Sequence, residues 1–342
     1  MKNSKMFIFI LLAFILVMIL PPETFSQGKP IELRLAHMFP IGATSHKHIE
    51  QWAKKIATDS NGRLTIRIFP VGTLIAPPEI YTSIGKGVAD LGFAFRYKPE
   101  GYGIGVTLPF IMGAPDTIVA TRVYDDLWKK FPKQMEEEWR EVKILYLSAS
   151  MPQYLIARKT LHRLEDVKGL QMRVSSREMG DLMKDLGATP VYMSTPDFMI
   201  GIEKGTVDGA SLIFEAIPDN KLGGRIKYVM THSLGVPTPV GVFMNKDSFN
   251  KLPADLQKVL EKSCEWAKED MMAYWSAGYE NAKKYCETEG VELVSLSREE
   301  KAKLVAIYER NRDKVGADLD AKGYPGTEIV KFIRERVEHY IR

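Results

Sequence analysis

Short hydrophobic runs and amphipathic stretches alternate along this chain. Apolar and polar residues alternate at Ile31–Ala36 and Arg63–Phe69, which is the period of a β-strand. Further apolar runs predict strands at Leu91–Phe95, Val142–Ser148 and Gln153–Ala157. Segments with the helical period of about 3.6 residues separate most of them. The order of strands and helices predicts an α/β fold built on largely parallel sheets.

The segment 167–210 is the clearest of these α/β units. Leu170–Val174 is a short β-like run, and helix, short strand, helix and strand patterns follow it. Ligand sites of such units lie at the carboxyl ends of the strands. Arg173 lies at that end, and its planar guanidinium can bind a carboxylate or phosphate through two parallel hydrogen bonds. A surface ion pair is the alternative role for this arginine.

The chain also contains an internal repeat. Residues Pro78–Asp90 align without gaps on Pro196–Asp208, and proline, acidic, isoleucine, Lys-Gly and aspartate positions recur in register. Each copy predicts a helix that stops at glycine, followed by a strand. Chance similarity in a common pattern is the alternative. The repeat favours two similar α/β lobes with a ligand cleft between them. We expect Asp90 and Asp208 to be cap or turn residues rather than an acid–base pair.

The longest helical pattern runs from Pro253 to Thr288. It would extend for roughly 50 Å, which is longer than one lobe requires, so we expect a helix that spans both lobes. The expected lobe 1 covers 28–148 and is completed by about 238–265. Lobe 2 covers 149–237 and is completed by about 266–342, with chain crossings near 148–153 and 236–240 that form a hinge.

The N-terminus has the features of an export signal. Lys2 and Lys5 precede an apolar run from Met6 to Leu20, and a polar segment follows with a cleavage position near Ser26. The run is short for a bilayer span. We therefore expect a signal peptide at 1–26 and a periplasmic mature chain, with an uncleaved anchor as the alternative.

Charge and cysteine usage exclude several classes of protein. The formal net charge is +4, and no cluster of lysine and arginine suggests a nucleic-acid partner. Cys264 and Cys286 fall in the same predicted helix, about 33 Å apart, which excludes a disulfide between them unless that helix is broken.

Enzymatic motifs are missing from the sequence in their expected contexts. These include the nucleophile elbow, the zinc-protease HExxH, the phosphate-binding P-loop and the dinucleotide fingerprint. His46 and His48 are two residues apart on a helix and point in different directions, so they do not form a metal pair. His37 ends a strand, where it can serve as a hydrogen-bonding residue of the cleft wall or as a structural histidine. We therefore expect that this protein is not an enzyme.

Four motifs carry a resemblance to a known family. They are V-K-G-L-Q-M-R-V, L-G-A-T-P-V, K-G-T-V-D-G and M-N-K-D-S-F-N-K-L-P followed by a long helix. In this order they resemble the solute receptors of tripartite ATP-independent periplasmic (TRAP) transporters. The resemblance implies that Arg173 holds the carboxylate of a small organic acid between the lobes. It also implies that membrane permease subunits of a TRAP transporter are the partner.

Differences from the family pattern refine the expected ligand. Dicarboxylate and sialic-acid receptors often carry a second arginine where this chain has Gln153, and an asparagine where it has Leu212. Gln153 with the pair Phe214-Glu215 is more similar to the branch that takes 2-oxo or 2-hydroxy monocarboxylates. In some members the glutamine and glutamate hold a Na⁺ or Ca²⁺ ion that bridges ligand and protein, which implies Gln153 and Glu215 as metal ligands here. An ion pair of Glu215 with a lysine or arginine is the alternative.

Several further residues are candidates for the cleft wall. An apolar tail of the ligand, branched or aromatic, would suit an aromatic lining. The candidates are Phe39, Phe95, Tyr97, Tyr192 and Phe214, with Arg96 and His37 beside them. The sequence therefore predicts a TRAP-type receptor for an organic acid. The alternatives are an exported receptor that feeds a signalling protein and an exported enzyme that acts on an organic acid.

Overall fold

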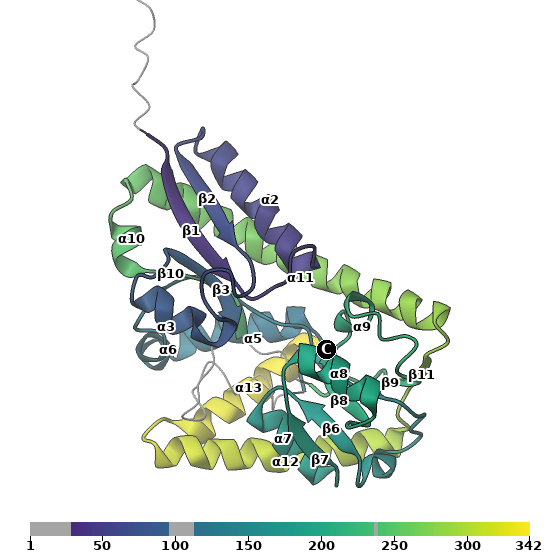
Figure 1. Cartoon of the computed structure of the whole chain (residues 1–342). Coiled ribbons are helices and arrows are strands. Elements are labelled where there is room, and N and C mark those ends of the chain that lie inside the picture. The colour runs from purple at the N-terminus through teal and green to yellow at the C-terminus, as the bar shows by residue number, and fades with distance from the viewer. Residues whose placement is uncertain (1–28, 96–112, 236–238) are drawn as a thin grey trace, which may run out of the picture.

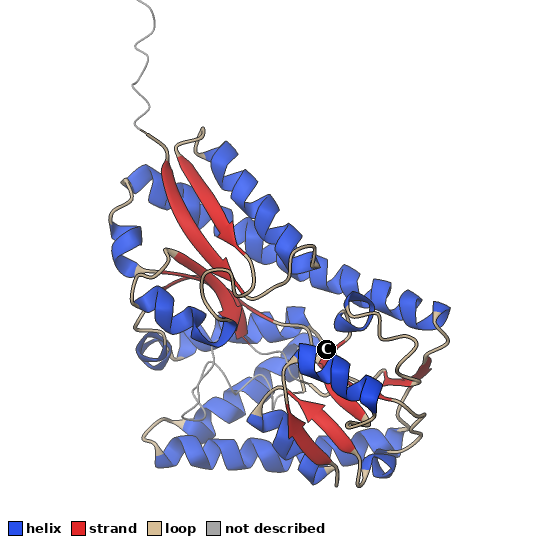
Figure 2. Ribbon diagram, in the orientation of Figure 1, coloured by secondary structure: helices blue, strands red, loops and turns tan. Residues whose placement is uncertain are grey.

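The computed structural model describes residues 29–95, 113–235 and 239–342. These residues form two lobes, each built on its own β-sheet (Figures 1 and 2). The predicted α/β, two-lobed fold class is confirmed. The expected signal peptide and the cleft candidates Arg96 and Tyr97 lie outside the described residues. Within the described ranges, no helix has both the length and the apolar character needed to cross a bilayer.

The first sheet has five strands in the order β2-β1-β3-β10-β4. β1 is parallel to β2 and β3, whereas β10 is antiparallel to its neighbours β3 and β4. β10 was missed by the sequence analysis, which placed a lobe crossing near 236–240. All six of its residues are buried, so it lacks the alternation that identifies a half-exposed strand. The bounds are β1 Ile31–His37, β2 Leu64–Phe69, β3 Leu91–Phe95, β4 Lys143–Ala149 and β10 Pro239–Met244.

The second sheet has six strands in the order β11-β9-β5-β8-β6-β7. β6 is parallel to β7 and β8, and β5 is antiparallel to β8 and β9. Read from β7, this order repeats that of the first sheet, with β5 in the place of β10. The bounds are β5 Gln153–Ala157, β6 Gln171–Val174, β7 Thr189–Tyr192, β8 Gly209–Ile213, β9 Tyr228–Met230 and β11 Glu292–Val294.

The repeat recognised in the sequence is also a repeat of hydrogen bonds. Asp90 accepts a bond from the main-chain N–H of Arg34 at 2.8 Å, and its own N–H donates to the carbonyl of Arg34 at 3.0 Å. Asp208 makes the same pair of bonds with Gln171, both at 2.8 Å. Each aspartate therefore fixes the register between the strand it precedes and the neighbouring parallel strand. Chance similarity does not explain this equivalence.

Each sheet receives its antiparallel strand through a lobe crossing. The chain passes from β4 to β5 through 150–152 and from β9 to β10 through 231–238. The first crossing is held by α5, because Thr117 Oγ1 donates to the carbonyl of Ser150 at 3.1 Å and Thr121 Oγ1 accepts from the N–H of Ala149 at 2.9 Å. The lobe boundaries inside loops and helices stay a prediction.

Helices cover both sheets, and α11 connects the lobes (Figure 1). α11 spans 35 residues, which is about 50 Å. Near its start it packs on α2, where Trp52 Nε1 donates to Ser263 Oγ at 2.9 Å. Near its end, the N–H of Gly223 donates to the hydroxyl of Tyr285 at 3.3 Å. The expected spanning helix is therefore confirmed.

The remaining helices complete the two lobes and their cores. Cys264 and Cys286 are both buried and free, as expected for two positions on one helix. The helix bounds are α2 Thr44–Asp59, η1 Pro77–Glu79, α3 Ile80–Gly85, α5 Thr117–Lys130, α6 Pro132–Glu138, η3 Leu164–Val167, α7 Arg177–Asp185, α8 Thr195–Lys204, α9 Ala216–Asp219, α10 Lys246–Asn250, α11 Ala254–Thr288, α12 Arg298–Ala321 and α13 Gly326–Ile341.

Candidate functional site

Arg173 lies in β6 at the carboxyl ends of the parallel strands of the second sheet. Its side chain is 5% exposed. Nε donates to the carbonyl of Met193 at 3.0 Å, and Nη1 donates to the carbonyl of Ser211 at 3.2 Å. Met193 follows β7 and Ser211 lies in β8, so these bonds fix the guanidinium plane across three neighbouring strands. A buried and oriented guanidinium is suited to bind an anion with little loss of side-chain freedom.

Gln153 is joined to Arg173 through Ser211. Gln153 is the first residue of β5 and pairs with the last residue of β8. Its amide oxygen accepts a hydrogen bond from the hydroxyl of Ser211 at 2.7 Å, while the carbonyl of Ser211 accepts from Arg173. The structure therefore brings Arg173 and Gln153 into one hydrogen-bonded group.

Phe214 belongs to an aromatic cluster between the second sheet and α11. Its ring centroid lies 5.2 Å from that of Tyr154 and 4.9 Å from that of Tyr279. Tyr154 and Tyr279 also line a cavity of about 160 Å³ at the first lobe crossing. The full lining is Asp116, Thr117, Met151, Pro152, Tyr154, Trp275, Ser276 and Tyr279. This cavity adjoins the aromatic cluster and offers space to an apolar group.

Glu215 follows Phe214 and carries a buried carboxyl group. It is 8% exposed, and no donor among the described residues bonds to its Oε1. Within the described ranges Glu215 forms no ion pair with a lysine or arginine, and that alternative stays open for the rest of the chain. Burial, with a smaller contribution from the charge of Asp219, raises the pKa of Glu215 to about 8. A buried polar atom without a partner is costly, so an external partner would stabilise it.

His37 supports the turn after β1. The N–H of Phe39 donates to His37 Nδ1 at 3.1 Å, and His37 Nε2 lies 3.0 Å from His46 Nδ1. Burial and the neighbouring His46 lower the pKa of His37 to about 4. His46 therefore faces β1, whereas His48 faces α11 and bonds to Asp270 at 2.7 Å. The two histidines point in different directions, as expected.

The other aromatic candidates are spread over both lobes. Phe39 packs its ring edge-on against Phe93, with centroids 5.2 Å apart, and Phe95 ends β3 half-buried. Tyr192 ends β7 with 54% of its surface exposed. No described contact joins these three residues to the Arg173 group.

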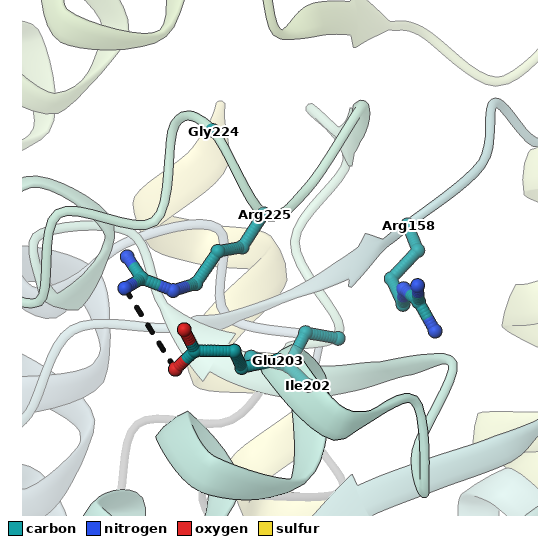
Figure 3. A pocket seen from close by; sticks show the side chains of 5 residues that line it. All are labelled: Arg158, Ile202, Glu203, Gly224 and Arg225. Atoms are coloured by element: carbon teal, nitrogen blue, oxygen red, sulfur yellow. Dashed lines mark ion pairs between the residues drawn. The ribbon is translucent and has the colours of Figure 1, made fainter.

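A second pocket lies at the opposite edge of the second sheet. It has a volume of about 410 Å³ and is lined by Arg158, Ile202, Glu203, Gly224 and Arg225 (Figure 3). Arg158 follows the carboxyl end of β5, which runs antiparallel to β8, whereas Gln153 lies at the other end of β5. The pocket is therefore separate from the Arg173 group, and its Arg225–Glu203 ion pair of 4.0 Å is a surface contact.

Three contributors to the site were missed by the sequence analysis. Ser211 is the one polar residue of the buried strand G-A-S-L-I, and this contrast was the available signal. Tyr154 and Tyr279 carried no such signal, because aromatic residues in strands and helices are usually core residues.

Comparison with known proteins defines the family. The chain belongs to the bacterial extracellular solute-binding proteins of family 7, whose family model matches residues 35–317. One relative is the monocarboxylate 2-oxoacid-binding periplasmic protein of Nostoc sp. strain PCC 7120, with 22% identity over 84% of this chain and 81% of that protein. Another is a solute-binding protein of Albidiferax ferrireducens, with 24% identity over 70% of this chain and 73% of that protein.

Solved structures show the same fold. A TRAP solute-binding protein from a marine metagenome, specific for aromatic acid ligands and bound to metahydroxyphenylacetate, matches with a TM-score of 0.82 and 22% identity, covering 91% of this chain and 100% of that one. A TRAP periplasmic solute-binding protein of Bordetella bronchiseptica with bound (R)- and (S)-mandelate matches with a TM-score of 0.78 and 22% identity, again covering 91% and 100%. At this identity the structures establish the fold.

Proposed function

We propose that this protein is the receptor of a TRAP transporter, which captures an organic acid between its lobes and delivers it to membrane permease subunits. The observation that carries the proposal is the buried guanidinium of Arg173 at the carboxyl ends of β6 and its neighbours. Arginine stays protonated in proteins, and its planar guanidinium matches the geometry of a carboxylate through two parallel hydrogen bonds. Family membership supports a binding role rather than catalysis.

The ligand that we propose is a 2-oxo or 2-hydroxy monocarboxylate with an apolar, branched or aromatic tail. The carboxylate would bind Arg173, and the adjacent oxygen would lie near Gln153. The cluster of Tyr154, Phe214 and Tyr279 supports a tail that is aromatic or branched, because burying apolar surface contributes about 25 cal/mol per Å². Mandelate, which the Bordetella protein binds, is an acid of this chemical type.

A bridging Na⁺ or Ca²⁺ at Glu215 and Gln153 is part of the same proposal. Hard cations take oxygen ligands, and the orphaned Oε1 of Glu215 is such an oxygen. The amide oxygen of Gln153 already accepts a bond from Ser211 but has a second lone pair. Within the described ranges no three histidine, cysteine or acidic side chains gather as a metal site, so amide, main-chain and ligand oxygens would have to complete the coordination.

The proposed location is the periplasm, with a signal peptide cleaved near Ser26. The charged and apolar pattern of residues 1–26 supports it, as does the extracellular placement of the family. N-terminal sequencing of the protein recovered from a periplasmic fraction tests the position. An intact N-terminus in the membrane fraction would contradict it.

Arg173→Ala is the decisive variant for the binding role. It should weaken binding by about 2–5 kcal/mol, the range for losing one partner of a buried charge pair, and Arg173→Lys should recover only part of the loss. A thermal-shift screen would first compare mandelate, 3-hydroxybenzoate, pyruvate and succinate, because a bound ligand raises the melting temperature. Calorimetry with the best acid then measures the variants. Arg158→Ala, an exposed arginine of the other pocket, is the matched control.

Three results would contradict parts of this proposal. Near-parental affinity of Arg173→Ala would show that Arg173 does not hold the carboxylate of the ligand. Stabilisation by succinate and by none of the monocarboxylates would contradict the assignment of Gln153. Unchanged monocarboxylate binding after EDTA treatment and in sodium-free buffer would contradict the proposed cation. It would leave the proposed role of Arg173 unaffected.

A further inference from the structure

Phe214 and Glu215 pack against Gly278 and Tyr279 of α11. The Phe214 and Tyr279 rings lie with their centroids 4.9 Å apart. Beside them, the carboxyl group of Glu215 occupies the space where a side chain at residue 278 would start. A Cβ built on Gly278 would lie 1.6 Å from Glu215 Oε1 and 2.3 Å from its Cδ. Phe214 and Glu215, which follow β8 of the second sheet, are therefore packed against α11, the helix that connects the lobes.

We propose that Gly278 is a positioning residue of the ligand site, because its missing side chain leaves the space in which the Glu215 carboxyl group is held against α11. The inference rests on the proposed function only in its consequence for ligand binding. The packing itself belongs to the protein without ligand. Gly278 touches neither the proposed acid nor the proposed cation and acts through Glu215.

No other local demand explains a glycine at this position. Gly278 lies inside the long helix α11, where glycine is less favourable than alanine. Its backbone does not have the positive φ that favours glycine elsewhere in the chain. The three atoms nearest to the added Cβ are Oε1, Cδ and Cγ of Glu215. The space beside Gly278 is therefore taken up by this one side chain.

Gly278→Ala is consequently a tool to move Glu215 while leaving the backbone in place. The contacting atoms belong to the end of a flexible side chain, which can rotate away from the new methyl group. The carboxyl group would then leave its buried position, where Glu215 is 8% exposed, and become a solvated carboxylate near the β8 end. A displaced carboxylate disfavours an anionic ligand nearby, so we expect weaker binding of an acid.

A cycle of four proteins without ligand tests the packing. The parental protein, Gly278→Ala, Glu215→Ala and the double variant are melted at the same pH. We expect Gly278→Ala to lower the melting temperature in the parental background. In the Glu215→Ala background, Gly278→Ala should instead raise the melting temperature. The clash with Glu215 is then absent, and alanine is more favourable than glycine inside a helix. Equal shifts in both backgrounds would overturn the proposal. Ala277→Ser, at the exposed neighbouring position, controls for any change to this helix turn.

Calorimetry with mandelate tests the consequence for the site. We expect Gly278→Ala to weaken mandelate binding by about tenfold, which corresponds to about 1.4 kcal/mol, with parental affinity in Ala277→Ser. Unchanged affinity in Gly278→Ala would overturn the positioning role, whatever the melting temperatures show. If the parental protein binds none of the acids in the screen, the proposed function fails, while the ligand-free cycle still decides whether Gly278 positions Glu215.

Discussion

Acidification should destabilise this protein through His37. Both ring nitrogens of His37 are in use, since Nδ1 accepts from the N–H of Phe39 and Nε2 faces His46. A second proton would turn Nδ1 into a donor that points at another donor. The side chain is also 1% exposed, so a charge on it would be poorly solvated. The folded protein therefore holds His37 neutral at pH values where the unfolded chain is protonated.

The size of the effect follows from the two pKa values. An ordinary histidine has a pKa of 6.5, and the pKa of His37 in the folded protein is about 4. The difference of about 2.5, at 1.36 kcal/mol for each pKa unit, corresponds to roughly 3 kcal/mol. Between these values the unfolded state binds more protons than the folded state. The free energy of unfolding should therefore fall as the pH is lowered from about 6.5 to about 4.

Urea unfolding of the parental protein and His37→Gln between pH 7 and pH 4.5 measures this contribution. Glutamine does not titrate, so its stability should fall less on acidification, and the difference should approach the roughly 3 kcal/mol expected for His37. Other histidines, such as His48 and His232, titrate in both proteins and cancel in the comparison. His162→Gln, at an exposed histidine, is the control and should follow the parental curve. Parallel curves for the parental protein and His37→Gln would refute the reasoning.

Three further outcomes are expected. Asp208→Ala should lower the free energy of unfolding by about 1–2 kcal/mol in urea titrations, because the N–H of Gln171 loses its charged acceptor. Asp90→Ala should cost at least as much, since Asp90 also accepts from Ser248 Oγ at 2.7 Å, and no loss in either variant would contradict the anchoring role. Saturating ligand should make the protein more compact in small-angle scattering, as hinge closure requires. Identical curves with and without ligand would indicate a cleft that is already closed.

Local sequence patterns predict most of the secondary-structure elements of this fold. The strand bounds Leu91–Phe95 and Gln153–Ala157 were predicted without error, and the helix expected from Pro253 to Thr288 begins at Ala254. These elements are specified by features within a few residues of each other, such as apolar period, turn glycines and prolines. The repeat added long-range information, because the same aspartate recurs at the same distance from two strands.

The details that were missed depend on contacts distant in the sequence. β10 lies between two partners, and only pairing could identify its continuous apolar run as a central strand. The role of Gly278 becomes visible only when Glu215 is placed against it. The role of Ser211 becomes visible only when Gln153 and Arg173 are both found bonded to it. The sequence could nominate Arg173, Gln153 and Glu215, but not the contacts that orient them.

The candidate site and the proposed hinge share a residue, and this gives the proposed closure a physical route. Gln153 is the first residue after the crossing at 150–152, and its carbonyl accepts a hydrogen bond from the N–H of Leu234 in the other crossing at 2.8 Å. Its side chain meets Ser211 beside Arg173. A ligand that binds Arg173 and Gln153 would therefore act directly on the backbone where both crossings meet. In a fold whose sheets exchange strands through these crossings, a change of a few dihedral angles there reorients whole lobes.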